Sequence, residues 1–338
     1  MKNVLVTGGA GYIGSHTVVE LSNQGFHPII VDDLRNSSQE ILTGINQLIK
    51  DSFTFYPIDI CDKNLLFETI EKHNIYAIIH FAAYKSVGDS CAHPLEYYQN
   101  NLIGLMNVME ASAFFGIEKL VFSSSCTVYG EPDVKEVRET TAKKLPVSPY
   151  GFTKWMGEQI LEDYSKTKPD LQIICLRYFN PIGAHPSAQI GELPNGTPNN
   201  LLPYITQTAM GLQEKLTVFG NDYPTSDGTC VRDYIHVCDV ADAHVVALNY
   251  VGKNNPSLSH FNIGTGKGTT VLEVVDFFQK ITHAPLPFEI GNRRMGDVVE
   301  IYANVDLAKS ELQWAAKRSV ESAIEDAWRW EKSRKTNK

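Results

Sequence analysis

The architecture of the N-terminal half is indicated by residues 7–14, which read Thr7-Gly8-Gly9-Ala10-Gly11-Tyr12-Ile13-Gly14. The segment follows a short apolar run and opens an amphipathic stretch, so it joins a strand to a helix. Glycines at positions 8, 11 and 14 let the main chain approach a pyrophosphate, which the free N–H groups of a helix N-terminus attract. A tight turn with a purely structural role would also use glycines, but this position after the first strand favours a dinucleotide site.

Short apolar runs alternate with longer segments of helical period throughout the first half of the chain. This alternation is typical of βαβ units that build a parallel sheet. The runs expected to form six strands are residues 3–7, 28–32, 54–58, 77–81, 120–123 and 172–178. The sequence therefore predicts an α/β fold with a Rossmann-type doubly wound parallel sheet.

The local composition of the sequence changes near residue 180, beyond which prolines and glycines become frequent. We expect a cofactor-binding domain over residues 1–180 and a smaller mixed α/β lobe for the substrate over residues 181–338. Residues 231–250 read as a strand followed by a helix, and they are candidates to pack back on the first domain. The chain of 338 residues is long enough for two such domains.

Two carboxylates, Asp32 and Asp33, end the second predicted strand, 18 residues after Gly14. A carboxylate at this place accepts the 2′-hydroxyl of the adenosine ribose and repels a 2′-phosphate, which favours NAD over NADP. Arg35 could hold a 2′-phosphate, but two carboxylates stand beside it. An acid that only caps the next helix is the alternative.

Two further segments follow predicted strands at the edge where doubly wound sheets bind ligands. Asp59 follows the third strand and could meet the adenine. The small Ala82 and Ala83 follow the fourth strand, and they would let the pyrophosphate and ribose come close. Asn100 lies inside an amphipathic helix, where exposure to solvent explains it as well as a ligand contact does.

Ser125 lies in the serine-rich segment at the end of the fifth predicted strand, and Tyr150 and Lys154 open a later amphipathic segment. Their i, i+4 spacing places the tyrosine and the lysine on one helical face. A neighbouring ammonium and an oxidised nicotinamide would lower the pKa of a phenol from about 10 toward the working range. Such a phenol could take the proton of an alcohol, while the serine hydroxyl binds the same oxygen. Without the glycine loop, a surface pair would be the better explanation.

The composition is that of a globular protein, with 43% hydrophobic and 20% charged residues. Thirty Lys and Arg against 39 Asp and Glu give a formal charge of −9, which disfavours nucleic acids and anionic membranes as partners. The six cysteines are dispersed, so the sequence predicts no metal site and no disulfide framework. No signal peptide and no run of about 18 apolar residues is present, so we expect a cytoplasmic protein.

The sequence resembles the extended short-chain dehydrogenase/reductase family and, within it, the UDP-glucose 4-epimerase family. The motifs occur in the family's order across nearly the whole chain, at residues 7–14, 123–130, 148–154, 177–181, 198–203, 219–225, 227–229, 231–236 and 293–297. The stretch 227–236 is much more specific than the glycine loop, which many nucleotide enzymes share.

The resemblance implies NAD as the cofactor and Tyr150, Lys154 and Ser125 as the catalytic residues. The implied cofactor contacts are Gly8, Gly11, Tyr12, Ile13, Gly14, Asp32, Asp33, Leu34, Arg35, Asn36, Ser37, Asp59, Ile60, Phe81, Ala82, Ala83, Lys85, Asn100, Ser125, Tyr150, Lys154 and Phe179.

In the second lobe, the guanidinium forks of Arg232 and Arg294 suit a diphosphate, although surface ion pairs would explain them equally well without the resemblance. Asp297 could accept ribose hydroxyls, and Phe219 offers a flat partner for a base. The resemblance implies UDP-glucose and UDP-galactose as substrates. Their implied contacts are Ser125, Cys126, Thr127, Tyr150, Asn180, Asn200, Leu201, Thr217, Val218, Phe219, Arg232, Arg294, Asp297 and Ile301.

The implied reaction inverts carbon 4 of the sugar through a transient 4-keto sugar. Tyr150 takes the 4-hydroxyl proton while hydride passes to tightly bound NAD, and the hydride returns to the other face. The family also implies a homodimer through helices near residues 100–115 and 150–165. Ile301 corresponds to a position beside carbon 2, where bulk excludes N-acetyl sugars; its intermediate size leaves their acceptance open.

Two alternatives remain at this point. A nucleotide-sugar 4,6-dehydratase shares the first oxidation but needs an acid and a base beside the serine, whereas Ser125 is followed by Cys126, Thr127 and Val128. We interpret Cys126 as a packing residue. A non-catalytic NAD-sensing regulator on the same fold would have no need of Tyr150 and Lys154, which this chain retains.

Overall fold

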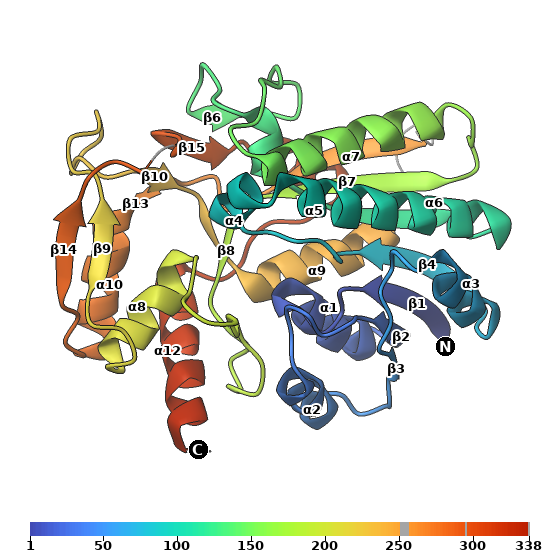
Figure 1. Cartoon of the computed structure of the whole chain (residues 1–338), viewed down its shortest axis with the longest axis horizontal. Coiled ribbons are helices and arrows are strands. Elements are labelled where there is room, and N and C mark those ends of the chain that lie inside the picture. The colour runs from blue at the N-terminus through green and yellow to red at the C-terminus, as the bar shows by residue number, and fades with distance from the viewer. Residues whose placement is uncertain (251–256, 295, 337–338) are drawn as a thin grey trace.

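The computed structural model of the chain describes residues 1–250, 257–294 and 296–336. A seven-stranded parallel sheet forms the centre of the larger lobe, at the right of Figure 1. Its strand order is β12-β7-β5-β4-β1-β2-β3, and this order reverses between β1 and β4. The strands are β1 (Lys2–Thr7), β2 (Phe26–Val31), β3 (Thr54–Tyr56), β4 (Ile75–His80), β5 (Lys119–Ser125), β7 (Gln172–Tyr178) and β12 (Leu258–Ile263).

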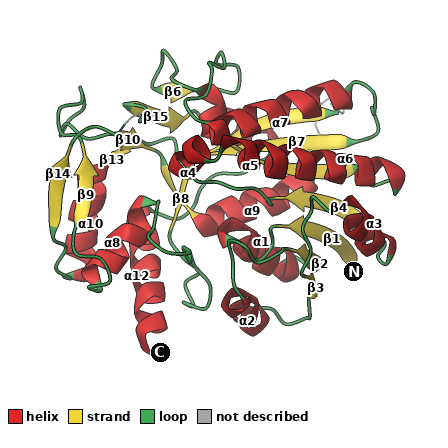
Figure 2. Cartoon of the chain, in the orientation of Figure 1, coloured by secondary structure: helices red, strands yellow, loops and turns green. Residues whose placement is uncertain are grey.

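Helices cover both faces of this sheet (Figure 2). Val4 and Val6 pack into the core on one face, and Leu5 between them packs into the core on the other. Because both faces are dry, the strands are continuous apolar runs. One face carries α1 (Tyr12–Asn23), α2 (Gln39–Leu48) and α9 (Val237–Leu248); the other carries α3 (Lys63–Glu71), α6 (Gly104–Phe114) and α7 (Pro149–Ser165). None of the helices in the described residues is long and apolar enough to cross a membrane.

The predicted doubly wound sheet is confirmed, with one strand more than the apolar runs indicate. The additional edge strand is β12, which pairs with β7 over six residues although it lies about 80 residues later in the chain. Helix α9 also returns to this lobe, where it packs against α1. The boundary near residue 180 stays a prediction, and the larger lobe takes a helix and a strand from beyond it.

The smaller lobe, at the left of Figure 1, is built around short strands and three helices. A four-stranded sheet has the order β13-β10-β15-β6, and its strand β6 comes from the first half of the chain. Its elements are β6 (Glu136–Val137), α8 (Leu201–Ala209), β9 (Leu216–Phe219), β10 (Val231–Arg232), β13 (Thr269–Thr270), α10 (Val271–Thr282), β14 (Phe288–Gly291), β15 (Glu300–Ala303) and α12 (Val320–Thr336).

Short elements join and support the two lobes. Strands β8 and β11 pair with each other in parallel, next to the point where the chain leaves the large sheet. The remaining elements are α4 (Val87–Ala92), α5 (Pro94–Tyr98), the π-helical turn η1 (Gln99–Ile103), the 3₁₀ turn η2 (Cys126–Tyr129), β8 (Asn180–Ile182), β11 (Tyr234–His236) and α11 (Asp306–Glu311).

Three histidines buried in the larger lobe make its stability sensitive to acid. Burial lowers the pKa of His16 and of His80 to about 3, and that of His244 to about 4. Below pH 6.5 these histidines become protonated in the unfolded chain but stay neutral in the native chain. The free energy of unfolding should therefore fall as pH drops from 6.5 to 5, by up to about 1.4 kcal/mol per pH unit for each histidine.

Urea unfolding of the holoenzyme at several pH values measures this slope. His80→Gln should reduce the slope by the contribution of one histidine. The His80 ring bonds the Thr7 hydroxyl at 2.7 Å, and a glutamine amide can also reach that hydroxyl. A free energy of unfolding that stays constant between pH 6.5 and 5 would contradict the prediction.

Candidate active site

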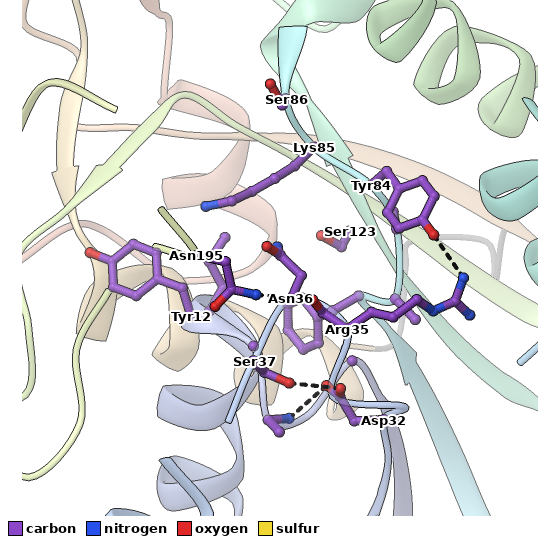
Figure 3. A pocket seen from close by; sticks show the side chains of 18 of the residues that line it. Tyr12, Asp32, Arg35, Asn36, Ser37, Tyr84, Lys85, Ser86, Ser123 and Asn195 are labelled. Carbon is purple, nitrogen blue, oxygen red and sulfur yellow. Dashed lines mark hydrogen bonds between the residues drawn. The ribbon is translucent and has the colours of Figure 1, made fainter. Parts of the chain in front are cut away.

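A cavity of about 580 Å³ lies beyond the carboxyl ends of the central strands (Figure 3). This is the place where the strand order reverses, and doubly wound sheets bind ligands there. Three of the predicted cofactor residues, Leu34, Ser125 and Phe179, are not among the described residues that line the cavity. The predicted cofactor residues that do line the cavity are Gly8, Gly11, Tyr12, Ile13, Gly14, Asp32, Asp33, Arg35, Asn36, Ser37, Asp59, Ile60, Phe81, Ala82, Ala83, Lys85, Asn100, Tyr150 and Lys154.

The glycine loop lies tightly against neighbouring main chain. A Cβ atom on Gly8, whose φ is +72°, would come within 2.7 Å of the Ala82 nitrogen, and one on Gly14 within 2.2 Å of the Gly8 oxygen. Helix α1 begins after Gly11, which has no side chain to cap the first N–H groups. The first turn can therefore offer these donors to an anion in the cavity, so the loop fits a dinucleotide pyrophosphate.

Asp32 stands at the end of β2 with both carboxylate oxygens engaged. It accepts hydrogen bonds from the main-chain nitrogens of Ala10 (3.1 Å) and Leu34 (2.9 Å) and from the Ser37 hydroxyl (2.8 Å), which Figure 3 shows. Burial raises the pKa of Asp32, and these hydrogen bonds oppose the rise. A carboxylate accepts about four hydrogen bonds, so Asp32 is held in place with room for a ribose hydroxyl. Leu34 acts here through its main chain.

Arg35 is neutralised by its neighbours. Its guanidinium group forms ion pairs with Asp33 and Asp59 and donates to the Tyr84 hydroxyl at 2.7 Å (Figure 3). A cation already shared by two carboxylates is a poor partner for a 2′-phosphate. The arrangement therefore favours NAD over NADP, as the acidic pair predicts.

Tyr150 and Lys154 lie on one face of α7, and both are buried, with exposed fractions of 8% and 4%. The helix begins at Pro149, and the Ser148 hydroxyl caps it by accepting from the Gly151 nitrogen at 3.2 Å. Lys154 donates through Nζ to the main-chain oxygen of Ser123 at 2.7 Å. These contacts bring the helix to the end of β5, where Ser125 accepts from the Thr127 nitrogen.

The pKa of the Tyr150 phenol differs from the expectation drawn from its spacing to Lys154. Burial raises this pKa above its ordinary value, and an interaction with the Ser125 side chain opposes the rise. Burial also lowers the pKa of Lys154 to about 8. Because the ammonium is turned to the Ser123 carbonyl, a phenolate at Tyr150 needs a further positive charge, such as the nicotinamide of NAD⁺.

Four of the predicted substrate residues form one cluster in the smaller lobe. Asp297 pairs with Arg294 at 2.8 Å and lies 3.7 Å from Arg232, and the Arg294 guanidinium carbon lies 5.5 Å from the centre of the Phe219 ring. This cluster supplies two cations, a carboxylate and an aromatic face, which suits a nucleoside diphosphate.

The other predicted substrate residues are dispersed around the two sites. Asn200 and Tyr150 line the cavity. Ile301 and Phe179 pack in one apolar cluster with Cys126 against it, and Leu201 packs in the core of the smaller lobe. Val218 is buried on β9, and Thr217 next to it lies against Gly291. Thr127 Oγ1 and Asn180 Oδ1 are buried without a hydrogen-bond partner in the described residues, as expected beside a polar ligand.

Several residues that line the cavity were not predicted. Tyr178 bonds the Ser123 hydroxyl at 2.7 Å; both lie at strand ends, so the rule that located Asp59 could have found them. Glu192 lies in the irregular stretch 191–200, and one of its oxygens accepts from both Lys85 (2.8 Å) and Asn200 (2.5 Å). The further polar lining residues are Tyr84, Ser86, Asp89, Tyr97, Asn195, Thr197 and Asn199.

Curated relatives match the chain over nearly its whole length. The UDP-glucose 4-epimerase of Bacillus subtilis (strain 168) is 48% identical over 330 residues, which are 98% of this chain and 97% of that protein. UDP-glucose 4-epimerase uge1 of Schizosaccharomyces pombe is 47% identical over 331 residues, which are 97% of this chain and 93% of that protein.

Solved structures match equally well. A UDP-glucose-4-epimerase from Stenotrophomonas maltophila with bound NAD and formylated UDP-arabinopyranose has a TM-score of 0.96 at 46% identity. The match covers 100% of this chain and 100% of that chain. The UDP-glucose 4-epimerase from Bifidobacterium longum in complex with NAD+ and UDP has a TM-score of 0.96 at 40% identity, with the same coverage.

The sheet, the glycine loop and the Tyr150–Lys154 helix face define a dinucleotide-dependent enzyme of the doubly wound α/β class. The chain belongs to the NAD dependent epimerase/dehydratase family, whose model matches residues 4–264. The family expected from the sequence motifs is confirmed.

Proposed function

We propose that this chain reversibly converts UDP-glucose to UDP-galactose at carbon 4, through a transient 4-keto sugar and with tightly bound NAD. The observation that carries the proposal is that Tyr150 and Lys154 line a cavity together with the glycine loop, while Lys154 bonds Ser123 on the strand end that also carries Ser125. The arginine cluster of the smaller lobe supports a second diphosphate site. The names of the curated relatives and the structures with NAD support the same reaction.

The chain's own residues handle protons and position the substrate. When bound, NAD would supply reversible hydride transfer, so that no net oxidation results. Tyr150 takes the proton of the 4-hydroxyl and later returns it, while the Ser125 hydroxyl binds the same oxygen. Arg232 and Arg294 hold the diphosphate away from the reacting carbon. The keto sugar can then turn about its phosphate linkage and present its other face.

The test of this proposal is to incubate the purified holoenzyme with UDP-galactose, without added NAD, and to identify the products by NMR. We expect an equilibrium mixture with UDP-glucose. UDP-N-acetylgalactosamine in a parallel reaction shows whether Ile301 leaves room for an N-acetyl group. If neither sugar is epimerised, even after NAD is added, the proposal is wrong.

Removal of one arginine of the cluster should weaken substrate binding. We expect Arg294→Met to raise the KM for UDP-galactose by about 10- to 100-fold, because hydrogen bonds to a charged group contribute about 1.5–3 kcal/mol. The kcat should change little, since the diphosphate lies away from the reacting carbon. Steady-state kinetics at several UDP-galactose concentrations separate the two constants.

The neighbouring arginine provides the matched control. Arg293 pairs with Asp222 at 2.7 Å and lies over the Tyr223 ring, so its charge is used outside the cluster. Arg293→Met should leave KM within about twofold of wild type. Equal KM values for the Arg294 variant and the wild type would place the diphosphate elsewhere.

The two alternative functions find less support. A dehydratase needs an acid and a base beside Ser125, but the next residue is Cys126, and burial raises the pKa of its thiol to about 11. A non-catalytic sensor would not need the buried Tyr150 and Lys154. We therefore retain epimerisation as the proposed reaction.

We also propose that the chain forms a homodimer in a reducing cytoplasm. Helices α5, α6 and α7 lie on one side of the larger lobe (Figure 1), and they carry exposed apolar side chains such as Leu95, Met106 and Met156. A face of this kind favours association. All six cysteines are free thiols, which suits a reducing compartment. Light scattering after gel filtration measures the mass of the assembly.

A further inference from the structure

Three residues of α7 at intervals of four face three consecutive serines at the end of β5. Lys154 donates to the main-chain oxygen of Ser123 at 2.7 Å, and the Ser124 hydroxyl donates to Glu158 Oε1 at 2.6 Å. Tyr150, one turn before Lys154, interacts with the Ser125 side chain. The helix and the strand are therefore joined by these three residues of α7, of which Tyr150 and Lys154 line the cavity and Glu158 does not.

The Glu158 carboxylate is fully buried, with every hydrogen-bonding position used. Oε1 accepts from Ser124 and from Arg177 Nε at 2.8 Å; Oε2 accepts from Arg177 Nη2 at 2.7 Å and from Lys143 Nζ at 2.7 Å. His260 Nε2 lies 3.6 Å from Oε2. Burial would raise the pKa of Glu158, but the hydrogen bonds and charge of Arg177 hold it at about 2. The group is an anion at every working pH.

Arg177 extends this network to the loop that follows Ser125. Its Nη1 donates to the Tyr129 hydroxyl at 3.1 Å and to the main-chain oxygen of Glu139 at 3.2 Å. The Tyr129 hydroxyl in turn donates to Asn262 on β12 at 2.6 Å. Glu158 thus connects the catalytic helix to β5, to β7 and, through Arg177, to the loop that carries Cys126 and Thr127.

We propose that Glu158 is a positioning residue for the reaction: it binds Ser124 and Arg177 and thereby fixes the face of α7 that carries Tyr150 against the strand end that carries Ser125. The inference rests on the proposed function. A proton transfer needs the phenol and the serine hydroxyl to converge on one oxygen, and a displacement of about 1 Å can cost about 100-fold in rate. A buried ion pair that served only stability would not need the additional bond to Ser124.

The charge of Glu158 also acts on Lys154, one turn away. Burial lowers the pKa of Lys154 to about 8, and the negative charge of Glu158 opposes this shift. Cys175 on β7 also faces Lys154, but burial raises the pKa of its thiol well above the usual value, so the thiol is neutral. His80 on β4 and His244 on α9 also face this ammonium, and their own low pKa values keep them neutral. On β5 it meets the Ser123 carbonyl and the Phe122 ring. Glu158 therefore helps Lys154 to stay protonated near neutral pH.

The experiment compares Ser124→Ala with a matched control, Ser112→Ala. Ser124→Ala removes the bond between β5 and α7 and leaves the Glu158–Arg177 pair in place. Ser112 is a similarly buried serine on α6 whose hydroxyl donates to the Val108 main-chain oxygen of its own helix, at 2.9 Å. We expect Ser124→Ala to lower kcat about tenfold, with KM for UDP-galactose, NAD content and Tm close to those of the control.

Glu158→Gln adds a second readout. It removes the charge, so the pKa of Lys154 should fall and the decline of kcat at alkaline pH should move to lower pH than in the wild type. If Glu158→Gln does not fold, the comparison of Ser124→Ala with Ser112→Ala tests the inference by itself.

The outcomes separate the inference from the function beneath it. If wild-type enzyme epimerises UDP-galactose and Ser124→Ala keeps the kcat of Ser112→Ala, Glu158 is structural only and the inference is wrong. An unshifted alkaline limb in a folded Glu158→Gln variant would likewise overturn it. Failure of the wild type to epimerise would instead overturn the proposed function.

Discussion

Tyr150→Phe should lower kcat for UDP-galactose by about three orders of magnitude, because the phenol oxygen is the group that takes and returns the 4-hydroxyl proton. General acid–base catalysis of this kind contributes about 100- to 10,000-fold. The neighbouring Tyr178 is a poor substitute for Tyr150, because its hydroxyl is engaged by Ser123 and burial raises its pKa to about 12. The initial rate at saturating substrate measures the loss.

Tyr164→Phe on the same helix is the matched control. Tyr164 lies outside the cavity, and its hydroxyl contacts the Met109 main-chain oxygen at 3.5 Å. This variant should keep wild-type kcat, and both variants should retain NAD. Turnover by Tyr150→Phe above a tenth of the wild-type rate would exclude the phenol as the proton acceptor.

Gly14→Ala should abolish stable NAD binding. A Cβ atom on Gly14 would lie 2.2 Å from the Gly8 oxygen and 2.9 Å from the Gly9 Cα, and both are main-chain atoms that cannot rotate away. The loop must therefore open, and the N–H groups at the start of α1 lose their alignment toward the pyrophosphate. We expect NAD content to fall at least tenfold, measured by absorbance after acid extraction of the purified protein.

Gly88→Ala provides the comparison. Gly88 also lies in the first turn of a helix, α4, but nothing lies within 4 Å of the Cβ atom it would gain. This variant should contain as much NAD as the wild type. A Gly14→Ala protein with full NAD content would show that the loop adapts without losing its ligand.

The fold could be predicted wherever hydrophobicity alone determines a strand. The central strands are buried on both faces and are continuous apolar runs, such as Val4-Leu5-Val6. β12 was missed because Ser259, His260 and Asn262 interrupt its sequence. The Asn262 side chain is satisfied by partners distant in sequence, the Val137 main-chain oxygen and the Tyr129 hydroxyl. A pattern rule cannot detect such partners.

The candidate site could be predicted where a single element brings its residues together. The glycine loop and the Tyr150–Lys154 spacing are local, and both reach the cavity. The direction of the Tyr150 pKa could not be predicted, because burial of the phenol depends on the whole fold. Asn100 lies in a π-helical turn, which the amphipathic pattern around it does not reveal. The place of Glu192 in the site could not be predicted either, because it depends on how residues 191–200 run along the cavity.

The last strand of the cofactor sheet gives the chain a particular order of assembly. β7 is complete at Tyr178, but its edge partner β12 ends at Ile263, after α8, β9 and β10 of the smaller lobe have been synthesised. Until β12 is synthesised, the edge of the apolar strand β7 is unpaired, and unpaired strand edges can pair with other chains and cause aggregation. A fragment that stops near residue 180 would keep this edge permanently open and should aggregate. Completion of the cofactor sheet therefore depends on synthesis of the first part of the smaller lobe.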